Sequence, residues 1–583
     1  MKTIIQKSIT VAGAMLLATT ITAQEYHPAP KFGTQGCIDF SITNILPEGE
    51  NSSAKAHALL PDGKIIIAGY NYNLSNNSYA ANLLKFDPVC GQLDTTFGQN
   101  GKLVHTFWGR TMLHDIALQS DGKIVGCGMI APSNAGSQQF AGLFRFNADG
   151  SVDSTLDGMG YTTTALPGGP GTFHDIMLDA SDKIYVVGKS GAFGQSNMVA
   201  VRYLSDGTLD NTYGISGMAK MPFDYFPSAG QMAGAMHTDG SITIAAMVGV
   251  FGGSSYYLGL CKFTPAGVAD ASFNLTGKVS YPSIPVSNNS SFKEMDMGIL
   301  SDDRVVIAYG QGLGGWPDQT ANVVAINPDG TIDSSFGTNG VFKYATVGAN
   351  AGGLYIMPDD KILLFFSENQ NNGPAGILRL MPDGTLDASF GNNGVILSPI
   401  GTQPDYRHFH DGFMLPNGNI IGYGNKNSIG MTAMRFTADT LTDGVPAITN
   451  TNGTLSIDSV AGAHVQWFLN DGPIAGATNF SYVTTQDGTY KVALDYYTGC
   501  NFESDTININ TVSVNEVKVL STFSLYPNPS KGIFTIESTQ YTEQQINYVV
   551  YDILGKTVAN GILKPQAGKI KETIHLGDKS KGM

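Results

Sequence analysis

The sequence predicts an all-β protein whose main part is a seven-bladed β-propeller. Its 583 residues include 71 glycines and only 14% charged residues, a composition that favours many short strands joined by glycine turns. One short phrase recurs seven times at intervals of about sixty residues, and a second phrase follows each copy. The two phrases together provide four strands per repeat, which is the strand content of a propeller blade.

The first phrase reads PDGKIIIAG at residue 61 and SDGKIVGCG at residue 120. The third residues of its seven copies lie 57 to 63 residues apart: Gly63, Gly122, Asp182, Gly240, Asp303, Asp360 and Gly418. Asp-Gly favours a tight turn, and the flanking alternation of apolar and polar residues favours strands with one buried face. In the second repeat we expect strands near 114–119, 123–129, 139–147 and 158–166.

The second phrase, for example NPDGTIDSSFGTNG at residue 327, carries one aspartate at a fixed position. The six copies are Asp94, Asp153, Asp210, Asp270, Asp333 and Asp387. These aspartates would either ligate calcium or cap turns. One or two carboxylates per repeat are fewer than a calcium cage requires, so we expect turn caps and no metal or cofactor. The residue three positions later is aromatic in five copies and Leu156 in the second, and we expect it to pack between blades.

The ends of the repeat region predict how the ring closes. In the seventh repeat, the second phrase is AMRFTADTLTDG at residue 433, and it lacks the FGxxG ending of the other copies. Near the N-terminus, KFGTQG at 31–36 has this ending but is not preceded by the rest of the phrase. We therefore expect residues 37–42 to pair with the strand near 431–438. Such a closure removes the exposed edges that an open array would leave.

The combined phrase PDGKIxxxG and RFxxDGxLDxxFGxNG resembles the delta-60 repeat family of exported bacterial proteins. The resemblance covers about residues 30–440 and implies a propeller-like repeat domain, which we place at 24–444. It implies no particular chemistry.

Export is also indicated by residues 1–23, which have the pattern of a secretory signal peptide: Lys2 and Lys7, a short apolar run and a small residue, Ala23, at the end. No later segment is apolar enough to span a membrane. The net charge of −15 and a pI near 5.0 exclude nucleic acid as an expected partner. Five scattered cysteines without a CxxC pair indicate neither a zinc site nor a disulfide framework, and their odd number leaves a free thiol.

Two smaller modules follow the repeats. Residues 446–512 resemble an immunoglobulin-like sandwich, with Trp467 in the core and Tyr490 in a tyrosine corner. Val492 stands where antibody domains have a cysteine, so this module, a spacer or a binding module, has to hold without that disulfide.

Residues 520–583, with SLYPNPSKGIF and YDILGK, resemble the C-terminal sorting domain of the type IX secretion system of Bacteroidetes-type proteins. The resemblance implies the secretion machinery as a partner and the cell surface or the extracellular space as the destination. Members of that family continue beyond the Lys-Gly pair with a final apolar strand. Since this sequence stops at Gly582-Met583, we expect an incomplete domain that is not sorted efficiently.

The sequence contains no GxSxG elbow, phosphate-binding loop or HExxH helix. Three histidine–aspartate pairs occupy one repeat position at the start of the first strand, where other copies have Lys55 and Asp296. The pairs are His114-Asp115, His174-Asp175 and His410-Asp411. First strands line the channel of a propeller, so the pairs would converge at its mouth and bind a metal or act as acid and base, or they are polar residues facing water. They are weak candidates, and we predict no catalytic residue.

The expected function is non-catalytic binding or adhesion to a polymer or protein outside the cell. Two alternatives remain open at this point. One is an enzyme that acts on an extracellular glycan through the histidine–aspartate cluster, and the other is a structural component of a surface layer.

Overall fold

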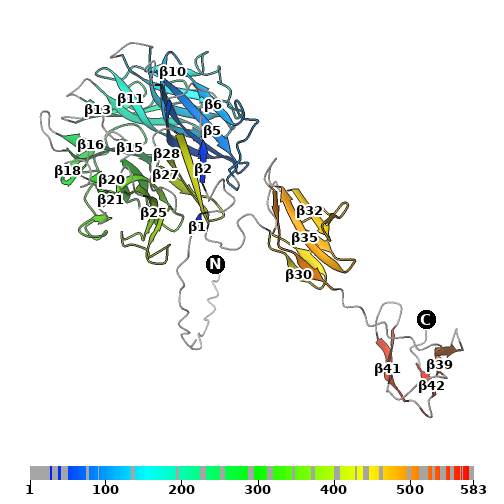
Figure 1. Cartoon of the computed structure of the whole chain (residues 1–583). Coiled ribbons are helices and arrows are strands. Elements are labelled where there is room, and N and C mark those ends of the chain that lie inside the picture. The colour runs from blue at the N-terminus through cyan, green and yellow to red at the C-terminus, as the bar shows by residue number, and fades with distance from the viewer. Residues whose placement is uncertain are drawn as a thin grey trace, which may run out of the picture. The chain divides into compact units, whose positions relative to one another are not determined.

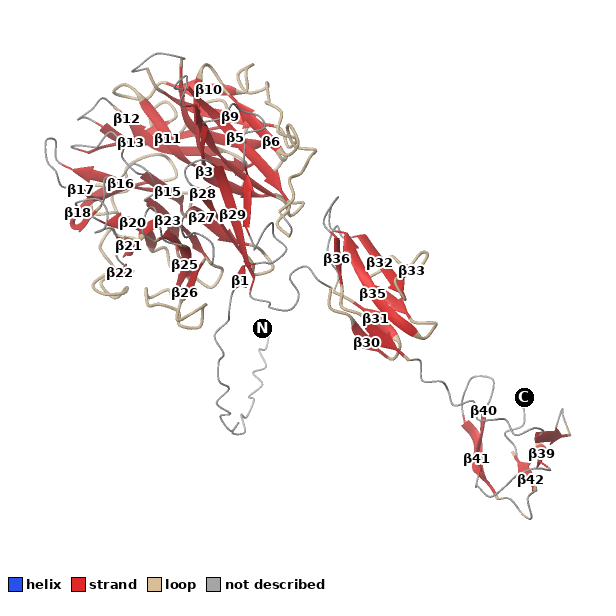
Figure 2. Cartoon of the chain, viewed as in Figure 1, coloured by secondary structure: helices blue, strands red, loops and turns tan. Residues whose placement is uncertain are grey.

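The computed structural model describes a chain of strands and turns, with no helix in the described residues (Figure 2). The described residues are 27–28, 37–40, 50–73, 78–89, 91–132, 138–191, 196–223, 232–249, 256–286, 295–311, 320–344, 348–368, 374–398, 407–426, 430–437, 446–458, 464–495, 501–510, 523–527, 532–538, 546–551, 557–564, 566 and 569–576. The predicted signal peptide lies outside them. Contacts divide the chain into two compact units, 1–445 with 494–502 and 446–493 with 503–583.

The first unit contains seven antiparallel sheets, which we number as blades 1 to 7 (Figure 1). Blade 1 consists of β3 (Glu50–Leu59), β4 (Ile65–Asn73), β5 (Ser78–Phe86) and β6 (Lys102–His105). Blade 2 consists of β7 (Arg110–Leu118), β8 (Ile124–Ala131), β9 (Phe140–Phe146) and β10 (Tyr161–Thr164). Blade 3 consists of β11 (Gly171–Leu178), β12 (Ile184–Ser190), β13 (Ser196–Tyr203) and β14 (Met218–Phe223). The four strands expected in the second repeat are confirmed, with ends that shift by a few residues.

The remaining sheets follow the same order along the chain. Blade 4 consists of β15 (Met232–Met236), β16 (Ile242–Gly249), β17 (Tyr256–Phe263) and β18 (Lys278–Pro285). Blade 5 consists of β19 (Met295–Ile299), β20 (Val305–Gln311), β21 (Thr320–Ile326) and β22 (Val341–Lys343). Blade 6 consists of β23 (Asn350–Ile356), β24 (Ile362–Ser367), β25 (Ala375–Leu380) and β26 (Val395–Leu397). Blade 7 takes β27 (Arg407–Met414), β28 (Ile420–Lys426) and β29 (Gly430–Thr437) from the end of the repeats.

Blade 7 is completed from the other end of the chain. The strand β2 (Cys37–Phe40) pairs antiparallel with β29, with Cys37 opposite Met434 and Phe40 opposite Met431. The two-residue strand β1 (His27–Pro28) also pairs with β29, opposite Phe436 and Thr437. The predicted pairing with the strand near 431–438 is therefore confirmed for residues 37–40, while residues 41 and 42 lie outside the described residues.

Each blade packs against the next, and blade 7 packs against blade 1. A separate cluster of buried apolar side chains fills each of the seven junctions; for example, Phe97 and Phe144 belong to the cluster between blades 1 and 2. The second strands are nearly fully buried because they have an apolar neighbour on both faces. Cys127 and Cys261 are buried free thiols, while the other three cysteine side chains lie outside the described set.

The repeated aspartates cap turns, as predicted, and also form ion pairs that the sequence did not indicate. In blade 2, Asp153 Oδ1 accepts hydrogen bonds from the backbone N–H and the hydroxyl of Thr155, at 3.1 and 2.7 Å. Its Oδ2 lies 2.6 Å from Nε of Arg145, and both side chains are buried. Equivalent pairs join Arg202 to Asp210 at 2.9 Å and Arg379 to Asp387 at 2.8 Å. The motif therefore stabilises the fold.

Three of the seven turn glycines are replaced by aspartates that keep the left-handed backbone. Asp182, Asp303 and Asp360 have φ values of 57°, 70° and 62°. Their carboxylates reach the preceding blade: Asp360 Oδ1 accepts the backbone N–H of Ser301 at 2.9 Å, and Asp182 accepts that of Ser120 at 3.1 Å. These bonds between blades offset the strain of a positive φ at a residue with a side chain.

The module after the repeats has two sheets. One contains β30 (Thr449–Thr451), β31 (Thr454–Ser456) and β34 (Ser481–Val483); the other contains β32 (His464–Leu469), β33 (Gly472–Pro473), β35 (Gly488–Asp495), β36 (Asn501–Glu503) and β37 (Ile507–Ile509). Trp467 is fully buried, and the Tyr490 hydroxyl donates a 2.8 Å hydrogen bond to the Gln486 carbonyl. The tyrosine-corner contact expected from the sequence is confirmed.

The C-terminal module also has two sheets. The first contains β38 (Phe523–Tyr526), β39 (Ile533–Ser538) and β42 (Ile570–His575), and the second contains β40 (Ile546–Tyr551) and β41 (Thr557–Leu563). Many of its described side chains are exposed or half-buried, and Ile570 and Ile574 are among the few that are buried.

Candidate functional site

The three predicted histidine–aspartate pairs lie on β7, β11 and β27, the first strands of blades 2, 3 and 7. First strands of successive blades contact one another around the whole ring, so they form its innermost layer. The three histidine–aspartate pairs therefore lie on the inner strands, as the sequence predicted.

A β-bulge occurs at this position in each of these strands. The register shifts between Leu113 and Asp115 on β7, and equivalent shifts occur on β11 and β27. The strand β3 of blade 1 has the same bulge at Lys55. A bulge re-aims one side chain relative to the regular alternation of a strand. Lys55, His114, His174 and His410 thus occupy equivalent bulges on four consecutive blades of the ring.

The last glycine of the first phrase makes room for this bulge. A Cβ added to Gly128 would lie 1.9 Å from the carbonyl oxygen of Met112, and one added to Gly69 would lie 1.9 Å from that of Ser53. Gly188 and Gly424 are equally restricted in blades 3 and 7. Blades 4, 5 and 6 have Ala246, Tyr309 and Phe366 at the aligned position. The first strand of blade 6 also shifts register, between Ala351 and Leu354, although Phe366 stands at the aligned position. The final glycine therefore accommodates the bulge in blades 1, 2, 3 and 7 but is not required for it in every blade.

The structure brings two of the three histidines together. The rings of His114 and His174 stack with centroids 5.3 Å apart and an interplanar angle of 24°. His114 Nδ1 lies 2.7 Å from the Phe173 carbonyl oxygen and therefore carries its proton. His410 is buried on blade 7, with blade 1 between it and His114. In the described part of the chain, no group of three or more His, Cys, Asp or Glu side chains could hold a metal ion.

The electrostatics of the cluster keep its imidazoles neutral. Burial lowers the pKa of His114 to about 4, and the Lys55 and Lys189 ammonium groups add to this effect. Burial and the neighbouring His114 hold the pKa of His174 well below its usual value. The pKa of Lys189 is lowered by burial to about 8. At neutral pH the pair therefore offers uncharged rings next to two lysines.

The aspartates of the predicted pairs join adjacent blades through backbone amides. Asp115 Oδ1 accepts the N–H of Ile116 at 2.8 Å, and its Oδ2 accepts the N–H of Ile176 in blade 3 at 2.9 Å. Asp175 Oδ2 accepts the N–H of Gly234 in blade 4 at 2.6 Å. Asp296, at the same position in blade 5, accepts the N–H of Leu354 in blade 6 at 2.9 Å. These carboxylates connect the inner strands of neighbouring blades.

Asp411 makes a different contact at the junction of blades 7 and 1. Its Oδ2 accepts the hydroxyl of Tyr423 at 2.9 Å, and this hydroxyl lies 3.0 Å from Nδ1 of His57. The His57 ring stacks on Phe413 with centroids 4.1 Å apart. Sequence reasoning missed His57 and Tyr423, although Tyr423 stands where most of the other blades have smaller residues.

The Asp115 contacts give a testable consequence for stability. Replacing Asp115 with alanine leaves two backbone amides, those of Ile116 and Ile176, without this acceptor. We expect a loss of about 2–3 kcal/mol in unfolding free energy, since each unsatisfied buried donor costs roughly 1–3 kcal/mol. Thermal unfolding of the full chain measures this loss. Asp121→Ala, in the exposed turn of the same blade, is the control and should change the midpoint little; equal effects would contradict the structural role of Asp115.

Comparisons with known families match two parts of the chain. A domain of unknown function described as a β-propeller, DUF5122, matches residues 60–97, 119–156, 180–213 and 358–390. A secretion system C-terminal sorting domain matches residues 524–583. No curated protein matches the sequence. In the described residues, no helix has the length and apolar character needed to cross a membrane.

Several solved structures are similar to the chain at low identity. A protein of unknown function from Dyadobacter fermentans shares 13% identity, with 55% of this chain and 93% of that chain covered and a TM-score of 0.34. The polysaccharide lyase Uly1 shares 10%, covering 66% and 90%, with a TM-score of 0.40. The β-propeller domain of the Trilobed protease from Pyrococcus furiosus shares 8%, covering 68% and 98%, with a TM-score of 0.35.

The repeat phrases, the blade-like sheets and the two family matches agree with one another. The sorting domain directs secretion to the cell surface or the extracellular space through the type IX system. The chain is thus a secreted protein built from DUF5122 β-propeller repeats and ending in a type IX secretion C-terminal sorting domain.

Proposed function

We propose that this protein binds an extracellular polymer or protein through its propeller without converting it chemically. In this proposal the seven sheets act as one closed seven-bladed propeller. The immunoglobulin-like module at 446–512 is a spacer, and the sorting domain at 520–583 delivers the propeller to the cell surface.

The observation that carries the proposal is the use of the inner-strand aspartates. A histidine acting as general base is usually oriented by a carboxylate, and acid–base catalysis needs groups that titrate near the working pH. Here Asp115 and Asp175 accept backbone amides of the next blade, and His114 bonds a backbone carbonyl instead. The low pKa of His114 also removes it from titration at neutral pH. These facts favour binding over turnover.

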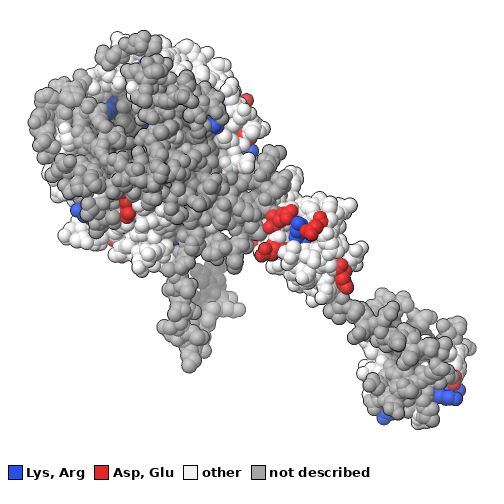
Figure 3. All heavy atoms as spheres, in the orientation of Figure 1, with Lys and Arg blue, Asp and Glu red and all other residues white. Residues whose placement is uncertain are grey.

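The surface charge favours partners that are not strongly acidic. The net charge is −15, and Figure 3 shows on one face that acidic side chains gather over the 446–510 module. At physiological ionic strength such a surface repels polyanions over about 8 Å. Neutral polymers and proteins with basic patches are the partners that fit.

The test separates binding from turnover. The full chain is incubated with neutral and acidic extracellular polysaccharides, and bound polymer and released product are measured together. We expect binding without product for the original chain and for the double variant His114→Gln, His174→Gln. His464→Gln, in the exposed part of the 446–510 module, is the matched control. Product that forms with the original chain and is lost at least tenfold in the double variant would overturn the proposal.

A further inference from the structure

The junction between blades 2 and 3 departs from the pattern of the other junctions. At four described junctions, the aromatic residue of one blade packs on the turn glycine of the next. The pairs are Phe97 with Gly150, Tyr213 with Gly267, Phe273 with Gly330 and Phe336 with Gly384. A backbone hydrogen bond accompanies each contact, such as the 2.8 Å bond from the N–H of Gly98 to the carbonyl of Asp149. We call this pair of contacts the junction clamp.

Both the aromatic contact and the backbone hydrogen bond of the junction clamp are altered between blades 2 and 3. Leu156 replaces the aromatic residue against Gly207, and Asp157 stands where other copies have glycine or asparagine. Asp157 keeps the left-handed backbone, with φ of 51°. Within the described residues, no backbone hydrogen bond joins Asp157 to Asp206, the residue aligned with Asp149. The junction therefore gives up stabilising contacts that its neighbours have.

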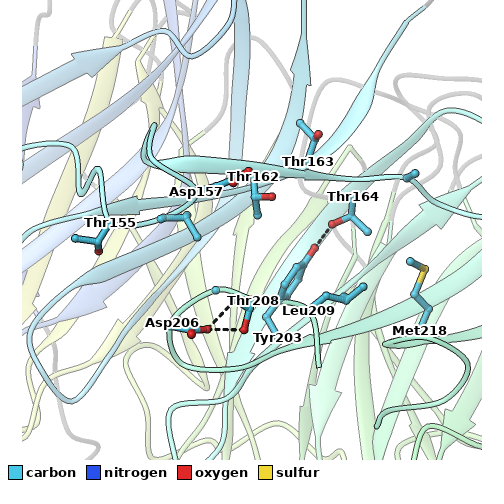
Figure 4. A pocket seen from close by; sticks show the side chains of 13 residues that line it. Thr155, Asp157, Thr162, Thr163, Thr164, Tyr203, Asp206, Thr208, Leu209 and Met218 are labelled. Carbon is cyan, nitrogen blue, oxygen red and sulfur yellow. Dashed lines mark hydrogen bonds between the residues drawn. The ribbon is translucent and has the colours of Figure 1, made fainter. Parts of the chain in front are cut away.

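A groove of roughly 520 Å³ opens at this junction (Figure 4). The outer strand β10 forms one side, and the turn around Asp206 forms the other. In Figure 4, Thr162 and Thr164 point toward Tyr203, while Thr163 points away. The hydroxyls of Thr164 and Tyr203 bond each other inside the groove. Its volume lies within the range of small-molecule sites.

The groove offers acceptors and hydroxyls above an apolar floor. Leu156, Leu209 and Met218 supply the apolar part. Asp206 Oδ1 accepts the N–H and the hydroxyl of Thr208 at 2.8 and 2.7 Å, but its Oδ2 has no partner in the described part of the chain. The Asp157 carboxylate is exposed and likewise makes no hydrogen bond to a described residue. No lysine or arginine lines the groove.

We propose that the groove between blades 2 and 3 binds a neutral sugar unit of an extracellular polysaccharide. Sugar hydroxyls donate to the free carboxylate oxygens, and the threonine hydroxyls donate to or accept from the ring substituents. The C–H face of the sugar packs on the leucine and methionine side chains. The groove lining carries two carboxylates and no lysine or arginine, and Arg145, whose charge reaches Asp206, is already paired with Asp153. This arrangement disfavours uronates and sulfated sugars. This inference rests on the proposed binding role and assigns it a site and a ligand class.

The other repeats of this chain indicate which double variant should close the groove. Leu156→Phe with Asp157→Gly restores the residues that other junctions have, so it should rebuild the clamp. We expect a higher thermal midpoint, because a packed ring replaces empty space and glycine relieves the positive φ. We also expect the affinity for the sugar to fall at least tenfold. Phe97→Leu, at the junction of blades 1 and 2, is the matched control and should lower the midpoint with unchanged affinity.

The experiment uses the full chain and defined probes. Cellohexaose, mannohexaose, xylohexaose and maltohexaose are titrated calorimetrically, with oligogalacturonate as the acidic comparison. We expect binding of at least one neutral probe, no binding of oligogalacturonate, and loss of binding in Asp206→Ala as well as in the clamp variant. Asp206→Ala changes an exposed turn residue, so it keeps the test valid if the clamp variant misfolds.

Three results would overturn the site. The first is that no neutral probe binds, and the second is that oligogalacturonate binds as tightly as the best neutral probe. The third is that the Asp206→Ala and clamp variants fold and bind the neutral probe with unchanged affinity. Each of them leaves the broader binding role standing if the chain still binds another polymer or a protein. Conversely, product formation would overturn the non-catalytic role while leaving the sugar site intact.

Discussion

Deleting residues 24–45 is expected to lower the thermal midpoint of the propeller by on the order of 5 °C or more, given the entropy of unfolding of a domain this long. The deletion removes β2 and β1, which together place six residues opposite β29. Each net hydrogen bond contributes about 1 kcal/mol, so the lost ladder amounts to a few kcal/mol. It also exposes the edge of β29 to pairing with other chains. Calorimetry and size-exclusion chromatography measure the two effects.

The control deletion removes residues 24–36 and keeps β2 in place. Since β1 pairs with only two residues of β29, this shorter deletion should have a clearly smaller effect. Replacing Cys37–Phe40 with a glycine–serine linker of equal length should instead reproduce the full loss. An unchanged midpoint after the longer deletion would refute closure of the ring by the N-terminal strand.

Replacing Asp153 with asparagine should destabilise the propeller by about 3–5 kcal/mol, the usual cost of leaving one member of a buried ion pair uncompensated. The guanidinium of Arg145 lies 2.6 Å from Asp153 and also donates to the Ser205 carbonyl at 3.0 Å. It is buried, and among the described residues Asp153 is the carboxylate that lies within ion-pair distance of it, while the charge of Asp206 acts on it from farther away. Thermal unfolding of the full chain measures the effect.

Asp149→Asn in the neighbouring exposed turn is the matched control for this pair. An exposed carboxylate contributes at most about 1 kcal/mol, and asparagine still accepts the N–H of Ser151. A loss for Asp153→Asn that is no larger than the loss for Asp149→Asn would contradict the stabilising role of the buried pair.

The same pair predicts a pH dependence. Burial raises the pKa of Asp153. The hydrogen bonds from Thr155 and the charge of Arg145 lower it by more than burial raises it, so the resulting pKa is about 2. Because the folded pKa lies below the unfolded value of 3.8, the stabilisation is complete above about pH 4 and is lost as the pH falls toward 2. The difference in midpoint between the original chain and Asp153→Asn should therefore shrink over this interval. A constant difference would contradict the assignment.

The repeat phrases allowed much of the fold to be predicted, because they report local requirements. Asp-Gly turns, the capping aspartates and the alternating strands each depend on a few neighbouring residues. The ring closure followed from counting phrase endings, since KFGTQG supplies the ending that the seventh copy lacks. The tyrosine corner at Tyr490 followed from a short local motif as well, and the structure identifies the Gln486 carbonyl as its partner.

The candidate site was predicted only in part. Alignment of the repeats within this chain placed His114 and His174 at equivalent positions, and their stacked rings agree with that placement. It did not reveal that Asp115 reaches Ile176, because the partner lies 61 residues away and contributes a backbone amide that has no sequence signature. Likewise, the residues His57 and Tyr423 come together only where the ends of the ring meet.

By itself, the sequence determined that this protein has repeated β-hairpins, an N-terminal segment that pairs with the last strand of the repeats, and a sorting domain. Each of these features depends on residue patterns within one repeat or one motif. Only the tertiary structure decided what the polar groups at the blade junctions do. Whether a carboxylate bonds an amide, neutralises Arg145 or faces the groove beside Leu156 depends on which side chains and backbone atoms the next blade presents. That neighbour is set by packing of the whole ring.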